Sequence, residues 1–141
     1  MLGEYLRELG RKSPYPLLVA PEMPHAPIWF DRALLRSVVE NLARNAYESY
    51  DDLPGERPIE VGLAREDGRV LLTIGDRGKG VPGGLGEKVF DPFFTDKIHG
   101  SGIGLPLSRR FVEAAGGTLT LVPREGGGTE ARVSLPVREG A

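Results

Sequence analysis

Two asparagine side chains carry the clearest chemistry in the sequence. Asn41 and Asn45 are its only asparagines, and glutamine is absent. Their i, i+4 spacing places both amides on one face of a helix, beside the apolar side that Leu42 and Ala46 occupy. An amide oxygen suits Mg2+ next to a polyphosphate, because Mg2+ takes few protein ligands and the amide adds no charge. The alternative is a hydrogen-bond pair between helix and loop, which the scarcity of amides elsewhere disfavours, and we predict a metal contact.

A second candidate is the glycine-containing segment IGDRGKGVP, residues 74–82. Asp76 stands at the end of a predicted strand, where its carboxylate can accept a hydrogen bond from an exocyclic amine such as that of adenine. Gly78 and Gly80 permit positive φ angles and a close approach of the backbone to a ligand. The alternative interpretation is an ordinary glycine turn with an exposed aspartate.

A third candidate is GSGIGLP, residues 100–106, in which three glycines at alternate positions lead into a helix. The backbone N–H groups of such a loop bind phosphate together with the helix N-terminus. The segment lacks the Gly-Lys-Ser/Thr ending of a Walker A loop. No strand directly precedes it, which disfavours a dinucleotide-binding fingerprint. By itself this motif is a weak indication.

Between these segments, VFDPFFTDKIHG (residues 89–100) combines aromatic side chains with a cation. Phe90, Phe93 and Phe94 are predicted to anchor a lid in a hydrophobic dock, and Lys97 is predicted to reach a phosphate. The alternative interpretation places the phenylalanines in the core, and we favour it for Phe90.

The elements that must position these residues follow from periodicity and turn residues. Apolar spacing predicts a helix over residues 2–9, and prolines bound two short predicted strands, Tyr15–Ala20 and Ile28–Phe30. Asp31 is the predicted N-cap of a strongly periodic helix that runs to about residue 50.

The second half of the chain predicts two hairpins separated by a helix. Ile59–Arg65 and Val70–Ile74 flank an Asp-Gly turn, and Thr118–Pro123 and Thr129–Val137 flank a run of glycines. A helix is predicted over Gly104–Ala115, ended by two glycines. Without regular βαβ alternation, the pattern indicates one α+β domain over residues 1–141. We expect a two-layer α/β sandwich whose mixed, mostly antiparallel sheet is covered by helices on one face.

Composition narrows the functional classes. The formal net charge is −2 with charges interspersed, so we expect no nucleic-acid partner and no direct membrane contact. The absence of cysteine excludes disulfides and thiolate metal sites. No apolar run approaches the roughly 20 residues of a membrane span, and we expect a cytoplasmic domain. Few amides with abundant Arg, Glu and Pro are typical of thermophilic proteins, although a GC-rich genome produces a similar bias.

Taken together, the motifs are more specific than any one of them. The order NLARNA, DRGKGVP, FDPFFTDK, GSGIGLPLSRRFVEAAGG, GGGTEARVSLP resembles the N, G1, F and G2 boxes and closing strand of the Bergerat-fold (GHKL) ATPases. Within that superfamily, Leu2 to Val137 resembles the catalytic and ATP-binding domain of a bacterial sensor histidine kinase. The forms NAYES and FFTDK are similar to the nitrogen-regulation type.

The resemblance implies ATP and Mg2+ as cofactors and a role for each matching residue. Asn45 would ligate Mg2+, Asn41 would lie beside the phosphates, and Asp76 would bind the adenine amino group with support from Thr129. Asn41 and Lys97 would take part in catalysis, and Lys97 would belong to an ATP lid that runs from about residue 90 to residue 101. The further ATP-binding positions that it implies are Gly78, Gly80, Val81, Phe94, Lys97, Gly100, Ser101, Gly102, Ile103, Gly104 and Leu105.

Position 41 separates subfamilies. Hydrolytic members and anti-sigma-factor serine kinases carry glutamate four residues before the metal asparagine, where it acts as general base. Asn41 cannot take a proton, and the adjacent Glu40 is rotated by about 100° around the helix axis. The sequence therefore favours transfer of the γ-phosphoryl group to an already nucleophilic imidazole over hydrolysis.

Some features depart from the family's pattern. Glu48 and Ser49 stand where many members have Lys and Tyr, and Asp96 stands where the nitrogen-regulation type has Thr. His25 lies in the proline-rich PEMPHAP, so no phospho-acceptor helix is present. We expect a monomeric fragment of a longer kinase that acts on a separate dimerisation segment and, indirectly, on a response regulator. The alternatives are a Bergerat-fold serine kinase or ATPase, and a regulatory module that only binds nucleotide.

Overall fold

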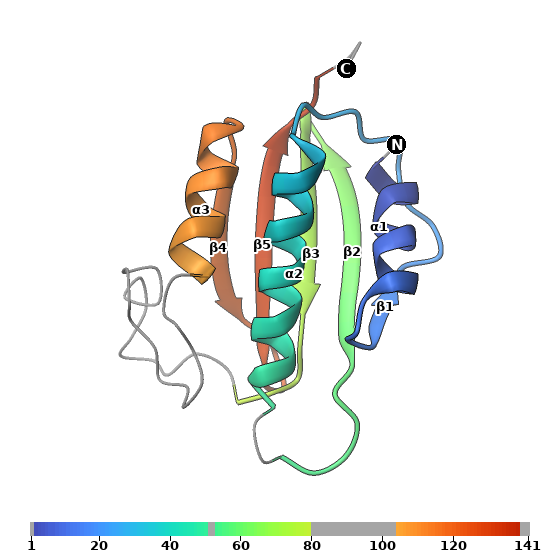
Figure 1. Cartoon of the computed structure of the whole chain (residues 1–141), viewed down its shortest axis with the longest axis vertical. Coiled ribbons are helices and arrows are strands. Elements are labelled where there is room, and N and C mark those ends of the chain that lie inside the picture. The colour runs from blue at the N-terminus through green and yellow to red at the C-terminus, as the bar shows by residue number, and fades with distance from the viewer. Residues whose placement is uncertain (1, 51–52, 80–103, 139–141) are drawn as a thin grey trace.

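The computed structural model describes residues 2–50, 53–79 and 104–138. Within these residues, helices α1, α2 and α3 lie on one face of a five-stranded sheet (Figure 1). The elements in chain order are α1 (Leu2–Lys12), β1 (Leu17–Val19), α2 (Arg32–Glu48), β2 (Ile59–Glu66), β3 (Arg69–Gly75), α3 (Gly104–Ala114), β4 (Thr118–Pro123) and β5 (Thr129–Pro136).

The sheet is mixed and mostly antiparallel, as predicted. Its strand order is β1-β2-β3-β5-β4, and only the β1–β2 pair is parallel among the paired strands. Side chains alternate between the two faces of a strand, so Val70, Leu72 and Ile74 of β3 are buried while Leu71 and Thr73 are half-buried. The α+β sandwich with helices on one face is confirmed.

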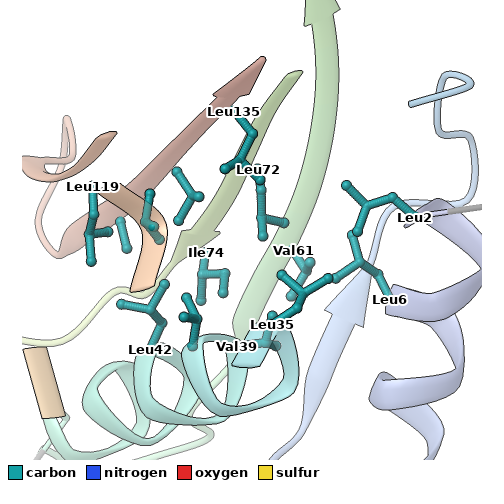
Figure 2. Packing of buried hydrophobic residues seen from close by; sticks show 14 of the residues in the cluster. Leu2, Leu6, Leu35, Val39, Leu42, Val61, Leu72, Ile74, Leu119 and Leu135 are labelled. Carbon is teal, nitrogen blue, oxygen red and sulfur yellow. The ribbon is translucent and has the colours of Figure 1, made fainter. Parts of the chain in front are cut away.

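The long helix α2 crosses the middle of the sheet and is held there by its apolar stripe. Leu35, Val39 and Leu42 point from α2 toward the sheet, where Leu42 lies near Ile74 and Leu35 lies near Val61 (Figure 2). Fully burying such a side chain contributes about 1.5–3 kcal/mol, so this stripe fixes how α2 is rotated about its axis. That rotation determines where the amides of α2 point.

The start of α2 is capped as predicted. Asp31 Oδ1 accepts hydrogen bonds from Ala33 N at 2.9 Å and Leu34 N at 3.1 Å. The β2–β3 hairpin is also confirmed, because Asp67 has φ 49° and Gly68 has φ 81°. Two central residues with positive φ are the signature of the tight hairpin turn that Asp-Gly favours.

One predicted strand is wrong. Ile28–Phe30 forms no strand, although Ile28 and Phe30 pack against the core and Trp29 is 66% exposed. The alternation of apolar residues here reflects packing against the core and not pairing with another strand. The backbone hydrogen bond from Arg138 N is accepted by Pro27 O, just before this segment, and the parallel β1 occupies the edge of the sheet beside β2.

The helices that the structure describes are too short and too polar to cross a bilayer.

Candidate nucleotide-binding site

Three of the motifs meet at one end of the sheet. The C-terminal end of α2, the segment after β3 and the start of β5 lie together there, and α3 begins beside α2 (Figure 1). The hydrogen bond from Lys79 N to Ser49 O, 2.9 Å, joins the segment after β3 to the end of α2. The hydrogen bond from Asp76 N to Thr129 O, 2.9 Å, joins it to β5.

Asp76 is a buried carboxylate with one oxygen engaged and one available. Its side chain is in a residue only 4% exposed. Oδ1 accepts a hydrogen bond from Gly78 N at 2.9 Å and a longer one from Thr129 N at 3.4 Å. Neither these nor any other hydrogen bond within residues 2–50, 53–79 and 104–138 uses Oδ2. An oxygen without a donor on so buried a residue indicates a ligand that carries an N–H group.

Thr129 adds a second buried polar atom beside Asp76. Its Oγ1 is buried and has no hydrogen-bond partner among the residues that the structure describes. Leaving such a hydroxyl unpaired costs about 1–3 kcal/mol, which a ligand or a bridging water would recover. The pair fits the adenine contact that the family resemblance implies for Asp76 and Thr129.

Gly78 is needed for packing against α2. Its φ is not positive, so this glycine is not required by the backbone conformation. A Cβ at this position would overlap Ser49 Oγ and stand 2.5 Å from Ser49 O. The close approach that requires glycine here is therefore to the end of α2, which sets how far the Asp76 segment lies from that helix.

Gly128 packs against the backbone of Asp76, and sequence reasoning assigned it only to a turn. It has φ 100°, and a Cβ there would overlap Asp76 O and lie 2.8 Å from Arg77 Cα. Three consecutive glycines, 126–128, exceed what a hairpin turn requires, and that excess is the one feature of the sequence that could have indicated this packing role.

Tyr50 is another positioning residue that sequence reasoning missed. It is 4% exposed, and its hydroxyl donates to Pro58 O at 2.5 Å and accepts from Arg77 N at 2.8 Å. The hydroxyl thus fixes the backbone next to Asp76 from the C-terminal side of α2. No feature of the sequence alone distinguishes this tyrosine from an ordinary core residue.

Asn41 joins α2 to α3. Its Nδ2 donates to Ser108 Oγ at 3.2 Å, and its Oδ1 accepts from Arg44 Nη2 at 2.8 Å. Arginine has only donors, so the amide oxygen must face Arg44 and the amide nitrogen must face Ser108. Ser108 is fully buried, which anchors the amide on the core side.

Asn45 lies one turn farther along α2, about 6 Å from Asn41 along the helix axis. Ser49, which contacts the Asp76 segment, lies about another 6 Å beyond. A ligand with its base at Asp76 and its phosphates near Asn41 would therefore run alongside α2 and pass Asn45. In the described parts of the chain no cluster of three or more His, Cys, Asp or Glu side chains could hold a metal. The amide oxygen of Asn45, together with the phosphate oxygens of a bound nucleotide, fits the ligands that Mg2+ takes.

The start of α3 lies against Asn41. A Cβ at Gly104, the first residue of this helix, would stand 3.8 Å from Asn41 Oδ1, and Leu105 packs against the core. The structure thus brings together Asn41, Gly104 and Leu105 in one group and Asp76, Gly78 and Thr129 in another, with Asn45 between them along α2. The predicted site residues that lie outside the described residues are Gly80, Val81, Phe94, Lys97, Gly100, Ser101, Gly102 and Ile103.

Sequence comparison identifies related proteins. Residues 30–139 match a family model described as histidine kinase-, DNA gyrase B-, and HSP90-like ATPase. The C4-dicarboxylate transport sensor protein DctS of Rhodobacter capsulatus is 41% identical over 113 residues, which are 79% of this chain and 17% of that protein. The signal transduction histidine-protein kinase AtoS of Escherichia coli is 35% identical over 112 residues, which are 79% of this chain and 18% of AtoS. The chain thus spans less than a fifth of these relatives.

Solved structures share the whole architecture. The nucleotide-free catalytic domain of histidine kinase ThkA superposes with a TM-score of 0.80 and 27% identity, covering 96% of this chain and 92% of that domain. A mycobacterial sensor histidine kinase, MprB, gives a TM-score of 0.75 and 27% identity over 96% of this chain and 91% of the other.

Proposed function

The chain belongs to the family of histidine kinase-, DNA gyrase B- and HSP90-like ATPases, and we propose that it is the ATP-binding catalytic domain of a sensor histidine kinase. It binds Mg-ATP and transfers the γ-phosphoryl group to a histidine on the dimerisation segment of its parent kinase. A response regulator then receives the group from that histidine. Relatives described as sensor proteins and as a histidine-protein kinase support this assignment.

The observation that carries the proposal is the unengaged oxygen of Asp76. Gly78 N holds Oδ1, which leaves Oδ2 to accept a hydrogen bond from the exocyclic amine of adenine. Thr129 Oγ1 supplies a second polar contact beside it. The carboxylate is buried, so it contributes most to binding when it meets a donor.

Asn45 would hold Mg2+ through its amide oxygen, with phosphate oxygens completing the coordination. There the ion would neutralise charge on the phosphates during transfer. Asn41 holds the amide face of α2 against α3 through Ser108, so the start of α3 stays in register with the phosphates. In the transfer, the bond from the γ-phosphorus to the bridging oxygen breaks, a phosphorus–nitrogen bond to imidazole forms, and ADP leaves.

The same site disfavours hydrolysis. Asn41 stands where hydrolytic members carry a basic glutamate, and its amide is bound by Arg44 and Ser108. Glu40 Oε1 pairs with Arg36 Nε at 2.9 Å on the exposed side of α2. This supports the expectation that Glu40 points away from the site. Without a general base at position 40 or 41, a nucleophilic imidazole is a better acceptor than water.

We also propose that residues 1–141 form a single domain. The family match begins at residue 30, yet Leu2 and Leu6 of α1 belong to the same buried cluster as Leu35 of α2. The nitrogen-regulation-like subtype stays a prediction from the sequence.

Binding of Mg-ATP is expected to raise the melting temperature of the chain. At one hundred times the dissociation constant, ligand binding stabilises a fold by about 2.7 kcal/mol. Asn45→Ala should remove most of the increase that depends on Mg2+ and keep the part that ATP produces with EDTA present. Differential scanning fluorimetry of parent and variant measures both. If Mg-ATP does not raise the melting temperature of the parent chain, the assignment of the nucleotide site is wrong.

Phosphoryl transfer is tested with labelled ATP and a separately produced dimerisation segment that carries the acceptor histidine. We expect acid-labile, alkali-stable label on that segment and none on the catalytic chain alone. Acid-stable label on serine would favour the serine-kinase alternative. Release of phosphate without labelled protein would favour an ATPase.

A further inference from the structure

Arg44 occupies a position on α2 that the proposed function has not used. It follows Asn41 by three residues and directly precedes Asn45. Its Nη2 lies 2.8 Å from Asn41 Oδ1 and 3.6 Å from the place that a Cβ of Gly104 would take. The guanidinium therefore stands between the amide face of α2 and the first residue of α3.

The charge of Arg44 is not met by a carboxylate in the described parts of the chain. Its one hydrogen bond there goes to the neutral amide of Asn41, although a guanidinium has five N–H donors. By contrast, Arg36 on the same helix pairs with Glu40, Arg124 pairs with Glu60 and Arg132 pairs with Glu130. Arg44 is also exposed, so its donors are accessible to a ligand.

The position of this charge is unfavourable unless an anion joins it. The N-terminus of a helix carries partial positive charge and disfavours a cation close to it. Arg44 nevertheless lies at the start of α3 and is held there by Asn41. An anion between the guanidinium and the helix would interact favourably with both.

The rest of α2 offers no substitute for this cation. After Arg44 the helix continues as Asn45, Ala46, Tyr47 and Glu48, and its last turn contains no basic residue. Any positive charge that α2 supplies beside the metal amide must come from Arg44.

We propose that Arg44 binds the polyphosphate of Mg-ATP, with Asn41 orienting its guanidinium toward the phosphates. This inference rests on the proposed function of the site. The planar, forked guanidinium donates two hydrogen bonds to phosphate oxygens, which the single ammonium of lysine cannot reproduce. Asn41 thereby acquires a second role, as the acceptor that aims Arg44.

The test compares Arg44→Gln and Arg44→Lys with Arg36→Gln in the full chain by isothermal titration calorimetry. Arg36→Gln is the matched control, since it removes one exposed positive charge from the same helix two turns away. We expect Arg44→Gln to weaken Mg-ATP binding about tenfold and to leave adenosine binding within about twofold of the parent. Arg44→Lys should bind Mg-ATP more weakly than the parent and more tightly than Arg44→Gln. Arg36→Gln should bind Mg-ATP and adenosine as the parent does.

Three results would overturn the inference. Unchanged Mg-ATP affinity in Arg44→Gln would show that the side chain does not meet the phosphates. Equal losses for Mg-ATP and adenosine would show that it acts through the fold. An equal loss in Arg36→Gln would show a general effect of charge. In each case the parent chain still binds Mg-ATP, whereas failure of the parent to bind would refute the proposed function itself.

Discussion

Replacing Asp76 by Asn is expected to weaken binding of Mg-ATP by about a hundredfold, the size expected when a charged hydrogen bond is lost and a buried donor is left unpaired. The hydrogen bonds of Asp76 explain why the substitution weakens binding. Gly78 N and Thr129 N both donate toward Oδ1, so an asparagine must keep its oxygen there. Its NH2 group then takes the place of Oδ2 and faces the adenine amine, donor against donor.

The same reasoning gives a matched control and a second measurement. Asp67→Asn makes the identical change in the exposed β2–β3 turn, where asparagine tolerates the positive φ of 49°. It should bind Mg-ATP as the parent does. Asp76→Asn should bind ITP better relative to ATP than the parent does, because the hypoxanthine carbonyl can accept from the new NH2 group. Parental ATP affinity in Asp76→Asn would contradict the adenine assignment.

Gly128→Ala is expected to lower the free energy of unfolding by about 3 kcal/mol, from left-handed backbone strain and overpacking together. Gly128 has φ 100°, and its Cβ would overlap Asp76 O while lying 2.8 Å from Arg77 Cα. Both obstacles are backbone atoms, so no side-chain rotation relieves the clash. The variant should also displace Asp76 and weaken nucleotide binding.

Gly127→Ala isolates the clash from the strain. Gly127 has φ 112° in the same turn, but nothing lies within 4 Å of the position its Cβ would take. The free energy of unfolding of Gly127→Ala should fall only by the cost of placing alanine in a left-handed backbone conformation, about 1–2 kcal/mol. Urea unfolding of both variants at equal m-value measures the difference. Equal losses would show that the close approach to Asp76 costs nothing.

The local elements could be predicted because their causes are local. Periodic apolar residues mark α2, the Asp31 side chain bonds to amides two and three residues ahead, and Asp67-Gly68 closes its own hairpin. The failed strand at Ile28–Phe30 shows the limit of this reasoning. Alternating apolar residues indicate burial on one side, but a strand also needs a hydrogen-bonded neighbour, and Ile28–Phe30 belongs to none of the five paired strands that the structure describes.

The site divides in the same way. Asn41, Asn45, Asp76 and Thr129 could be chosen from sequence because their residue types and order match a family of ATPases. The need for glycine at position 78 could not be predicted from the sequence. A Cβ there would overlap Ser49, a residue 29 positions earlier in the chain. Tyr50 and Gly128 were missed for the same reason: each acts on a backbone segment that is distant in sequence.

By itself, the sequence determined most of the helices and strands of this protein, the order of its motifs and the residue types that can contact a nucleotide. Only the tertiary structure decided which of those side chains hold one another. Asn41 meets Ser108 across 67 positions, and Asp76 meets Thr129 across 53. The first hydrogen bond depends on how the apolar stripe of α2 packs on the sheet, because that packing sets the rotation of the helix and so the direction of Asn41. The second depends on the antiparallel pairing of β3 with β5.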